Sequence, residues 1–326
     1  MAGVAHVAPG ENIATALATS AYKVELEAGT HTLGSTLTVP DYKWLSGHGY
    51  GTVINASTPL TEAIRATGTR SKLTDFRISG TSGGTLTRGL HITEDDGSAE
   101  SIVADGIYVE GNGYVGTGIA VAADTSGDVA EINIIGCRVQ SCTVAAYSTG
   151  NGTAGNVLNI RGWGNVGIGS VIGLLMSGSN ASWRDCTMQN NTDADVVLGT
   201  PATSPIVIDG CRSENSRRFW RCTGSGTAAR QITIANVTAT AFTDVDGVVF
   251  RHEASHPIFM ASCRFESGTA APATIVLGSS LVYPTSFEYV NLVFDGASAL
   301  PAASTSAVNG SGLIYQDGSS RARRLS

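Results

Sequence analysis

Charged side chains are scarce in this sequence of 326 residues. Asp, Glu, Lys and Arg together make up 14% of it, against about 25% in an ordinary soluble domain. Basic residues are also in the minority, 20 against 27 acidic ones, which gives a formal net charge of −7. Proteins that bind nucleic acids present a basic surface, so the sequence predicts no nucleic-acid partner.

Long apolar runs are missing as well. No segment approaches the roughly 18 consecutive apolar residues of a membrane-spanning helix, so we expect no membrane partner. The opening segment, MAGVAHVAPG, carries neither the basic nor the apolar region of a secretory signal peptide. The sequence therefore predicts a protein that is made and folded in a cytoplasm.

Cysteine is sparse, with six residues in the chain and no Cys-x-x-Cys pair. Small disulfide-bonded scaffolds are much richer in cysteine, and structural zinc sites use closely spaced pairs. We therefore expect no disulfide framework, no bound metal and no cofactor.

Glycine, by contrast, is abundant, with 40 residues in the chain, or about 12% against the usual ~7%. Hydrophobic residues make up 42% of the sequence, which is enough to bury a large core and excludes a disordered chain. This composition is typical of many short strands joined by tight turns.

An internal repeat is the strongest signal in the sequence. Four cysteines lie in similar contexts, INIIGCRV, SWRDCTM, IVIDGCRS and IFMASCRF, where apolar or large residues alternate with the period of a β-strand. The same frame extends to nine positions: Phe76, Ile107, Cys137, Trp163, Cys186, Cys211, Val237, Cys263 and Leu292. Their mean spacing is 27 residues, a period that is typical of solenoid proteins.

The repeat unit has neither helical periodicity nor the frame of a leucine-rich repeat. Short β-branched strands between Gly, Asn, Asp and Ser turns instead predict an all-β fold, a parallel β-helix of roughly ten coils. Strands stacked about 4.8 Å apart place the repeat positions in one inward column. We expect the cysteines of this column to be free thiols that act as small core hydrophobes.

The N-terminal segment predicts a cap for this solenoid. Residues 11–19 form a short amphipathic helix with Ile13, Ala16 and Leu17 on one face, which suits the open end of a first coil. The segments that follow, LEAGTHTLGSTLTVP and LSGHGYGTVI, resemble the first coils of pectate-lyase-like proteins, which are single-stranded right-handed β-helices. The resemblance spans about residues 10–56. It implies a right-handed β-helix but no particular activity, because that superfamily includes lyases, hydrolases and non-enzymatic virion proteins.

These observations predict three regions along the chain. They are an N-terminal arm and capping helix at residues 1–23, the parallel β-helix at residues 24–296, and a linker with a short C-terminal β segment and basic tail at residues 297–326. A hairpin turn is expected at residues 316–319. The tail, GSGLIYQDGSSRARRLS, resembles the short C-terminal β segments that close phage fibre and tailspike polypeptides.

No catalytic motif of the related enzymes can be carried over to this chain. Polygalacturonase-like members combine NTD, DD, GHG and RxK motifs, in that order, on successive coils. This sequence contains these letters in another order, with GHG at residues 47–49, RxK at residues 70–72, DD at residues 95–96 and NTD at residues 191–193. Asp95 and Asp96 have no partners at coil spacing, and His48 of the GHG triplet lies in an early coil. The catalytic residues are therefore left unassigned.

Two further motifs have a plain structural interpretation. The glycine-rich segment at residues 47–51 precedes a strand, whereas a phosphate-binding loop precedes a helix, so we interpret it as a turn. Residues 252–256 spell His-Glu-x-x-His, the zinc motif of metalloproteases, but that chemistry needs both histidines on one helical face. Strand-like runs flank this copy and Pro257 follows at once, so we expect a turn without a metal.

Two surface features are candidate contact sites. Charged residues recur one and three places after the repeat column, on the outward face of the strands: Arg77, Arg138, Arg212 and Arg264, and Glu110, Glu214, Glu266 and Asp295. One interpretation of this ladder is ion pairing between coils that discourages aberrant association. The alternative is a functional surface, either a groove for polar sugars or a charged subunit interface.

The second feature is a denser patch near the middle of the chain. Its members are Glu214, Arg217, Arg218, Phe219, Trp220 and Arg221. Exposed aromatic rings beside arginines fit either an interface or sugar stacking.

The capped rod, the lack of a catalytic motif that can be carried over and the fibre-like tail favour a structural virion protein of a bacteriophage. We expect a homotrimeric tail spike, tail fibre or capsid decoration, mounted on other virion proteins, that presents a rigid face to a host glycan or stabilises the particle. The alternative is an enzyme, a polysaccharide lyase or glycoside hydrolase acting on a bacterial surface glycan, in which two or three acids of neighbouring coils converge. A third interpretation is a non-viral bacterial β-helix that binds glycans without cleaving them.

Overall fold

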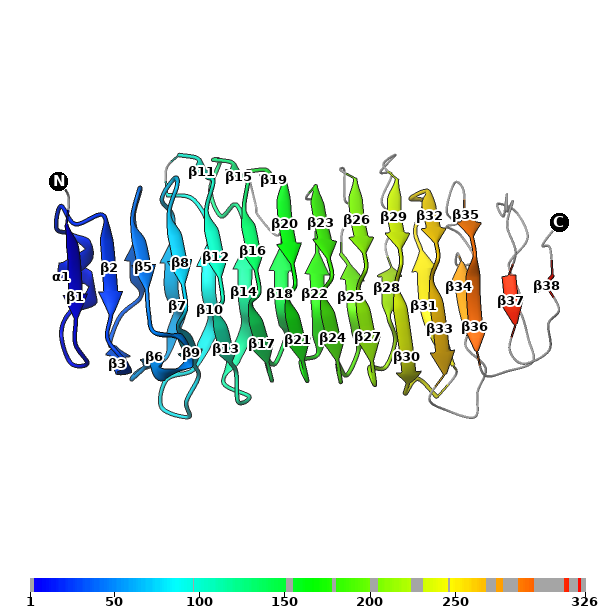
Figure 1. Cartoon of the computed structure of the whole chain (residues 1–326), viewed down its shortest axis with the longest axis horizontal. Helices are drawn as coiled ribbons and strands as arrows, with labels where there is room; N and C mark the ends of the chain where they lie inside the picture. The colour runs from blue at the N-terminus through cyan, green and yellow to red at the C-terminus, as the bar shows by residue number, and fades with distance from the viewer. Residues whose placement is uncertain are drawn as a thin grey trace. The chain divides into compact units, whose positions relative to one another are not determined.

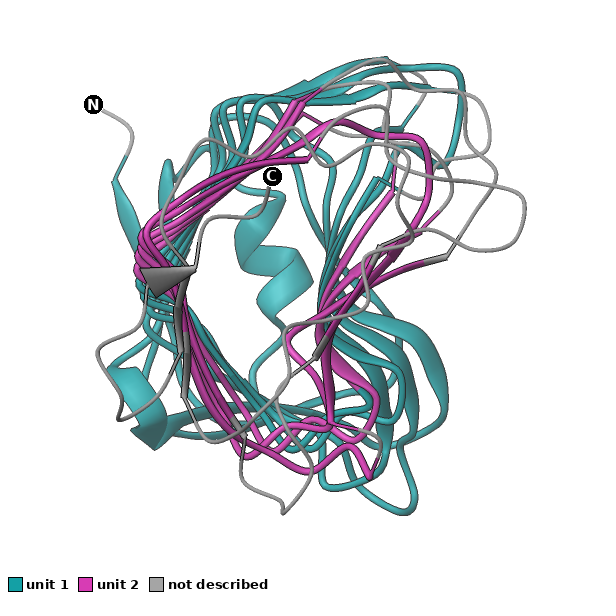
Figure 2. Cartoon of the chain, turned by 90° about the vertical axis from the view of Figure 1, so that its right-hand side faces the viewer, with its two compact units in different colours: residues 1–171 teal, residues 172–326 magenta. Residues whose placement is uncertain are grey.

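The structure is a computed structural model in two compact units, residues 1–171 and 172–326, which Figure 2 distinguishes by colour. It describes residues 3–95, 97–150, 155–177, 180–199, 205–223, 231–245, 247–267, 274–277, 287–295, 314–316 and 322–323.

Strands dominate both units, and they belong to three long sheets (Figure 1). Strands of successive coils pair in parallel; Leu73, for example, pairs with Leu45 on one side and with Ala104 on the other. This pairing defines a parallel β-solenoid, and the described residues form about nine turns of it. The predicted all-β parallel β-helix is confirmed.

In unit 1, the first sheet contains β1 (Val4–Val7), β2 (Lys23–Leu26), β5 (Trp44–Ser46), β8 (Lys72–Thr74), β12 (Val103–Asp105), β16 (Asn133–Ile135) and β20 (Ile160–Trp163). The second contains β3 (Gly29–Leu33), β6 (Thr52–Ala56), β9 (Arg77–Ser79), β13 (Tyr108–Glu110), β17 (Arg138–Gln140) and β21 (Val166–Ile168). The third contains β4 (Leu37–Val39), β7 (Leu60–Ala66), β10 (Leu86–Ile92), β14 (Val115–Val121) and β18 (Ala145–Thr149). A small additional sheet contains β11 (Ala99–Glu100), β15 (Val129–Ala130) and β19 (Val157–Leu158).

In unit 2, the first sheet contains β23 (Ala181–Arg184), β26 (Ile206–Asp209), β29 (Ile232–Ala235), β32 (Ile258–Ala261) and β35 (Phe287–Val290). The second contains β24 (Thr187–Gln189), β27 (Arg212–Glu214), β30 (Thr238–Phe242), β33 (Arg264–Ser267), β36 (Leu292–Asp295), β37 (Ile314–Gln316) and β38 (Ala322–Arg323). The third contains β22 (Ile172–Met176), β25 (Ala194–Leu198), β28 (Trp220–Thr223), β31 (Val248–Glu253) and β34 (Thr274–Leu277).

The repeat column is buried in both units, as predicted. Its buried members are Phe76, Ile107, Cys137, Cys186, Cys211, Val237, Cys263 and Leu292. All six cysteines of the chain are free and buried. The sulfur of Cys137 makes weak hydrogen bonds to backbone carbonyls, at 3.5 Å to Ala104 in the preceding coil and at 3.4 Å to Ile135. The thiols therefore pack as small hydrophobes, as expected.

The prediction that Trp163 belongs to this buried column is wrong. Its side chain is 63% exposed, whereas Asn165 is fully buried. The Asn165 carboxamide accepts a 2.9 Å hydrogen bond from the amide of Cys137 and donates a 2.7 Å bond to the carbonyl of Ile134. A search for apolar repeats misses this position because its polar side chain bonds to the backbone of the preceding coil.

A left-handed backbone residue stands directly before each buried position of the column. These residues have φ between 52° and 64°: Asp75, Gly106, Gly136, Gly164, Asp185, Gly210, Asn236, Ser262 and Asn291. This conformation costs most L-residues about 1–2 kcal/mol, and Gly, Asn and Asp tolerate it best. The corner between the first-sheet and second-sheet strands of each coil therefore selects the small and turn-forming residues seen in the repeat.

The predicted N-terminal cap is present. Helix α1 covers Ile13–Leu17, and the side chain of Asn12 accepts a 3.1 Å hydrogen bond from the amide of Thr15 at its start. Ile13 and Leu17 are buried against β1, β2 and β4, and the helix lies within the outline of the unit 1 coils in the end-on view (Figure 2). Strand β1 pairs in parallel with β2, so strand pairing begins before the helix.

The glycine-rich segment forms a turn, as expected. Gly49–Gly51 is a single turn of 3-10 helix, η1, and β6 follows it directly. None of the helices in the described part of the chain has the length and apolar character needed to cross a membrane.

Two short strands of the C-terminal segment are described. Strand β37 pairs in parallel with β36, and β38 pairs antiparallel with β37 through Tyr315 and Ala322. An antiparallel pair is what the predicted hairpin requires, although Asp317, Gly318 and Ser319 lie outside the described residues. The region boundaries at residues 23 and 296 stay predictions.

Candidate functional site

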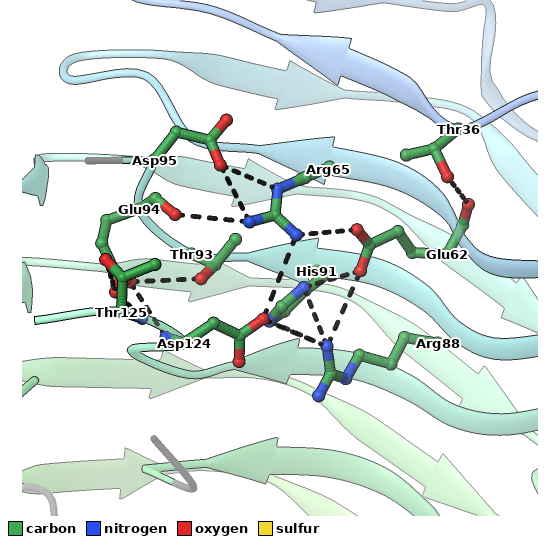
Figure 3. Close-up of polar contacts among 10 residues, drawn as sticks. All are labelled: Thr36, Glu62, Arg65, Arg88, His91, Thr93, Glu94, Asp95, Asp124 and Thr125. Carbon is green, nitrogen blue, oxygen red and sulfur yellow. Dashed lines mark hydrogen bonds and ion pairs between the residues drawn. The ribbon is translucent and has the colours of Figure 1, made fainter. Parts of the chain in front are cut away.

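A cluster of charged side chains lies on the third sheet of unit 1 (Figure 3). Its members are Glu62, Arg65, Arg88, His91, Glu94, Asp95 and Asp124. Glu62 on β7 is the register partner of Arg88 on β10, and Arg65 is that of His91. The remaining members follow β10 and β14 in sequence. Stacking of successive coils therefore brings together residues that are far apart in the chain.

Glu62 is the most constrained carboxylate of the cluster. Its Oε2 accepts a 2.7 Å hydrogen bond from Nδ1 of His91, and its Oε1 accepts a 3.0 Å bond from Arg65. Burial alone raises the pKa of Glu62, but the hydrogen bonds from His91 and Arg65 outweigh it and lower the pKa to about 2. Glu62 is therefore ionised at neutral pH and acts as an acceptor.

His91 links Glu62 to a second carboxylate. Its ring is fully buried, and Nε2 lies 3.7 Å from Oδ2 of Asp124. One guanidinium nitrogen of Arg88 lies 3.1 Å from Nδ1 and 3.4 Å from Nε2 of this ring. A donor in the plane of the ring cannot reach both nitrogens, so the guanidinium lies over the ring face. The same nitrogen is 3.5 Å from Asp124 and 3.7 Å from Glu62.

A third carboxylate, Glu94, anchors the segment that carries Asp124. It accepts hydrogen bonds from the hydroxyl of Thr125 at 2.9 Å and from the amide of Asp124 at 3.3 Å. Burial raises the pKa of Glu94, but the hydrogen bonds from Thr125 and Thr93 bring it below its usual value. This acid therefore fixes the position of Asp124.

The members of the cluster that reach solvent are two arginines and two aspartates. Their side chains are exposed by 23% for Arg65, 27% for Arg88, 29% for Asp124 and 53% for Asp95. Arg65 lies between the two acids, 2.9 Å from Asp95 and 4.0 Å from Asp124. Guanidinium donors beside carboxylate acceptors in fixed positions can hydrogen-bond the hydroxyl groups of a sugar.

A groove of about 600 Å³ lies over the first residues of β7, β10 and β14. Its lining includes the hydroxyl-bearing residues Thr61, Thr85, Thr87, Tyr114 and Thr143. Thr61 and Thr87 directly precede Glu62 and Arg88 in sequence, and the ring of Tyr114 is 39% exposed. Hydroxyl groups and an exposed aromatic ring give this groove the chemistry of a carbohydrate contact surface.

The sequence patch at residues 214–221 is for the most part a buried network. Phe219 and Trp220 are 1% and 0% exposed, so the prediction that these rings are exposed is wrong. Trp220 instead stacks on Phe250 of the next coil, with ring centroids 5.6 Å apart. The pattern of the patch does not reveal which of its alternating positions face the core.

The arginines of this patch pair with acids. Arg217 and Arg218 lie 3.1 and 2.5 Å from the same carboxylate oxygen of Asp244, which is 1% exposed. Arg221 lies 2.8 Å from Asp193. A contact role for the partly exposed Arg217 and Arg221 stays a prediction.

The predicted charge ladder links neighbouring coils. Arg77 lies 3.2 Å from Glu110 of the next coil, and Gln189 donates a 3.0 Å hydrogen bond to Glu214. The side chain of Asp295 lies outside the described residues. The Arg77–Glu110 contact agrees with ion pairing between coils, and a sugar-binding or interface role for the ladder stays a prediction.

The expectation that Asp95 has no partner at coil spacing is wrong, because Arg65, 30 positions earlier, binds its carboxylate. A signal for the cluster is nevertheless present in the sequence. Glu62 precedes Arg88, and Arg65 precedes His91, by 26 positions, close to the repeat period. Asp96 lies outside the described residues.

The His-Glu-x-x-His segment is not helical, as expected, but it is not a simple turn. His252 and Glu253 belong to β31, and the rings of His252 and His256 meet edge-on with centroids 5.8 Å apart. Cys222 lies beside them.

Three solved structures share this architecture at low sequence identity. A tailspike of an Acinetobacter phage superposes with a TM-score of 0.59 at 12% identity, over 92% of this chain and 59% of its own length. The catalytic unit of an α-1,3-glucanase from Streptomyces thermodiastaticus gives 0.55 at 13% identity, over 98% of this chain and 69% of the other. A pectate lyase gives 0.53 at 13% identity, over 94% and 78%.

The chain has a pectate-lyase-like β-helix fold. No family model matches the sequence, and no curated protein matches it either. At this level of identity the likenesses establish the fold alone. The function of this β-helix must therefore be argued from its own side chains.

Proposed function

We propose that this β-helix binds a bacterial surface glycan at the charged cluster of unit 1, as part of a bacteriophage virion protein of the tailspike kind. The observation that carries the proposal is the convergence, at the surface, of guanidinium and carboxylate groups from neighbouring coils. Rigid strands position these groups, and a buried layer formed by Glu62 and His91 holds them from beneath. A preorganised first layer with such support is what selective binding requires.

The charge of the cluster indicates the class of glycan. Four carboxylates face two guanidinium groups, which leaves a net charge of −2 when His91 is neutral. An anionic sugar would be repelled by the excess of carboxylates. A neutral or amino sugar, whose hydroxyl and amino groups donate hydrogen bonds, fits better.

Cleavage of the same glycan is a second candidate function. Hydrolysis requires a carboxylic acid and a carboxylate on either side of the scissile bond. Glu62 cannot supply the proton because hydrogen bonds keep it ionised, with a pKa of about 2. Asp95 and Asp124, the exposed acids on either side of Arg65, are the candidates for the two roles. A lyase acting on uronates is disfavoured, since the cluster has an excess of negative charge.

The virion role and the trimer are supported by two features. The fold is shared with a phage tailspike, and the C-terminal tail resembles the closing segments of phage fibres. Light scattering tests the trimer, with an expected mass of three 33.5 kDa chains. Removal of the last roughly fifteen residues should weaken the trimer, and an unchanged mass would contradict this role of the tail.

Glycan binding is tested with the full-length protein on an array of purified bacterial lipopolysaccharides and capsular polysaccharides. We expect saturable binding to neutral or amino-sugar polymers and none to uronate-rich ones. Release of new reducing ends from a bound polymer would establish cleavage, and unchanged polymer length would establish binding alone. Absence of binding to the whole array, or binding confined to uronate-rich polymers, would contradict the proposal.

A further inference from the structure

A second cluster of polar side chains lies inside unit 2. Cys222 on β28 and His252 on β31 are register partners in the third sheet. His256 follows in the segment between β31 and β32, and its ring contacts that of His252. The cysteine sulfur and one ring nitrogen of each histidine all lie within 4.8 Å of one another.

This triad is buried in an otherwise apolar column. Exposed fractions are 1% for Cys222, 0% for His252 and 2% for His256. Along the third sheet, the register partner of Cys222 in the preceding coil is Leu198, which is itself buried. An apolar side chain at position 252 would avoid the cost of burying polar atoms in this core.

The hydrogen bonding of His252 leaves one of its nitrogens unsatisfied. Nδ1 accepts a long hydrogen bond of 3.3 Å from the indole nitrogen of Trp220, and Nε2 has no hydrogen-bond partner. Buried polar atoms without partners are rare and costly.

We propose that Cys222, His252 and His256 form a buried binding site for a thiophilic transition-metal ion, with copper(I) as the favoured ion. One thiolate and two imidazoles are a ligand set that copper and zinc both accept. Metal–ligand bonds of about 2.0–2.3 Å hold ligand atoms about 3.5–4 Å apart. Closing the triad around an ion therefore takes side-chain shifts of about 1 Å.

Charge balance favours copper(I) over zinc(II). Copper(I), one thiolate and two neutral imidazoles have zero net charge, whereas zinc(II) with the same ligands leaves one positive charge in the core, where an unpaired charge is costly. Structural zinc also takes four protein ligands, and the cluster in the described residues has three.

Binding releases one proton, because the thiol becomes a thiolate when its sulfur bonds the ion. Because this proton is released on binding, the affinity for the ion should rise with pH. If Nε2 of His252 ligates the ion, the ring proton resides on Nδ1, and the hydrogen bond from Trp220 is lost. Tryptophan fluorescence should therefore change on binding.

The test offers copper(I), as its bicinchoninate complex, to the full-length protein during anaerobic refolding. We expect transfer of one copper per wild-type chain, a fluorescence change and tighter binding at higher pH. Cys222→Ser and His252→Leu should lose the transfer. His252→Leu replaces a buried polar ring with an apolar side chain, so it should fold at least as stably as the metal-free wild type. A loss of copper in a folded variant therefore cannot be attributed to unfolding.

Cys263→Ser is the matched control, because Cys263 is equally buried, at 1% exposure, and is not part of the triad. It should retain one copper per chain. Failure of the wild type to take copper, or equal uptake by Cys222→Ser, would overturn the site. Uptake of zinc(II) in place of copper(I) under the same conditions would overturn the assignment of the ion.

Discussion

The carboxylate of Glu62 and the imidazole of His91 form a hydrogen-bonded pair, 2.7 Å from Oε2 to Nδ1, beneath the exposed arginines and aspartates of unit 1. Because Nδ1 donates to Glu62, Nε2 is the nitrogen directed toward Asp124, 3.7 Å away. Both members are buried, so neither meets a ligand directly. They are positioning residues that hold Arg88 and Asp124 in place.

The Glu62→Gln variant should lower the free energy of unfolding by about 2 kcal/mol at neutral pH, because His91 and Arg65 lose a charged acceptor. The pKa of Glu62 falls from 4.5 to about 2 in the folded protein. This contribution to stability is therefore complete above pH 4.5 and is lost as the pH falls toward 2. Urea unfolding of the wild type and the variant over this range should show the difference shrinking.

Glu131→Gln is the control for that comparison. Glu131 also pairs with an arginine, Arg161 at 3.2 Å, but the side chains are 42% and 60% exposed. Exposed ion pairs contribute about 0–1 kcal/mol, so this variant should change little. Equal losses in the two variants would contradict the special position of Glu62.

Asp195 gives the opposite dependence on pH. Its fully buried carboxylate accepts hydrogen bonds from Asn191 at 2.7 Å and from the hydroxyls of Ser213 and Ser216. Burial raises its pKa from 3.8 to about 6, although these hydrogen bonds act against the rise. The folded state then holds the proton more tightly than the unfolded state, so this group stabilises the fold as the pH falls from about 7 to about 5.

Urea unfolding at these two pH values should show that contribution in the wild type and not in Asp195→Asn. A rise in the pKa from 3.8 to about 6 corresponds to at most about 3 kcal/mol. The Glu62 contribution is constant in this range, so it does not mask the effect. The same pH dependence in both proteins would show that Asp195 is not the responsible group.

The six cysteines should be unreactive in the metal-free folded protein. All are buried, and burial raises the pKa values of Cys137, Cys142 and Cys222 to about 12, which leaves almost no thiolate to react. Titration with Ellman's reagent should detect no thiols in the native chain and six after denaturation. Rapid reaction of one or more thiols without denaturant would contradict the packing of the cysteine column.

Asn165→Ala should destabilise unit 1 by about 2 kcal/mol, because the amide of Cys137 and the carbonyl of Ile134 lose their buried partner. Asn156→Ala is a suitable control, since Asn156 is exposed and hydrogen-bonds Asp128 at the surface. Thermal unfolding should separate the two variants. A loss in Asn156→Ala as large as that in Asn165→Ala would show that the buried hydrogen bonds are unimportant.

Much of the fold is predictable from the sequence because the coils repeat the same local chemistry. The column around Cys137 and the left-handed residue before it, Gly136, recur from coil to coil between residues 75 and 292 and define both the strand and the corner. Trp163 and Asn165 show the limit of that signal. A buried amide that bonds to the backbone cannot be recognised from apolar periodicity alone.

The candidate site was less predictable for a related reason. The motifs of characterised enzymes do not occur in their usual order on successive coils, and a cluster such as Glu62 with Arg88 depends on the register between coils rather than on neighbouring letters. Phe219 and Trp220 illustrate the same difficulty, since only the three-dimensional pairing shows that both rings face the core.

The most direct test of glycan binding at the charged cluster is a comparison of affinities for a polymer identified on the array. Asp124→Asn and Arg88→Ala should each weaken binding by about tenfold or more, as expected for the loss of a charge-assisted hydrogen bond. Arg161→Ala, which removes an exposed arginine from strand β20 of the first sheet, should bind like the wild type. Unchanged affinity in both cluster variants, or an equal loss in Arg161→Ala, would contradict the assignment of the glycan site to this cluster.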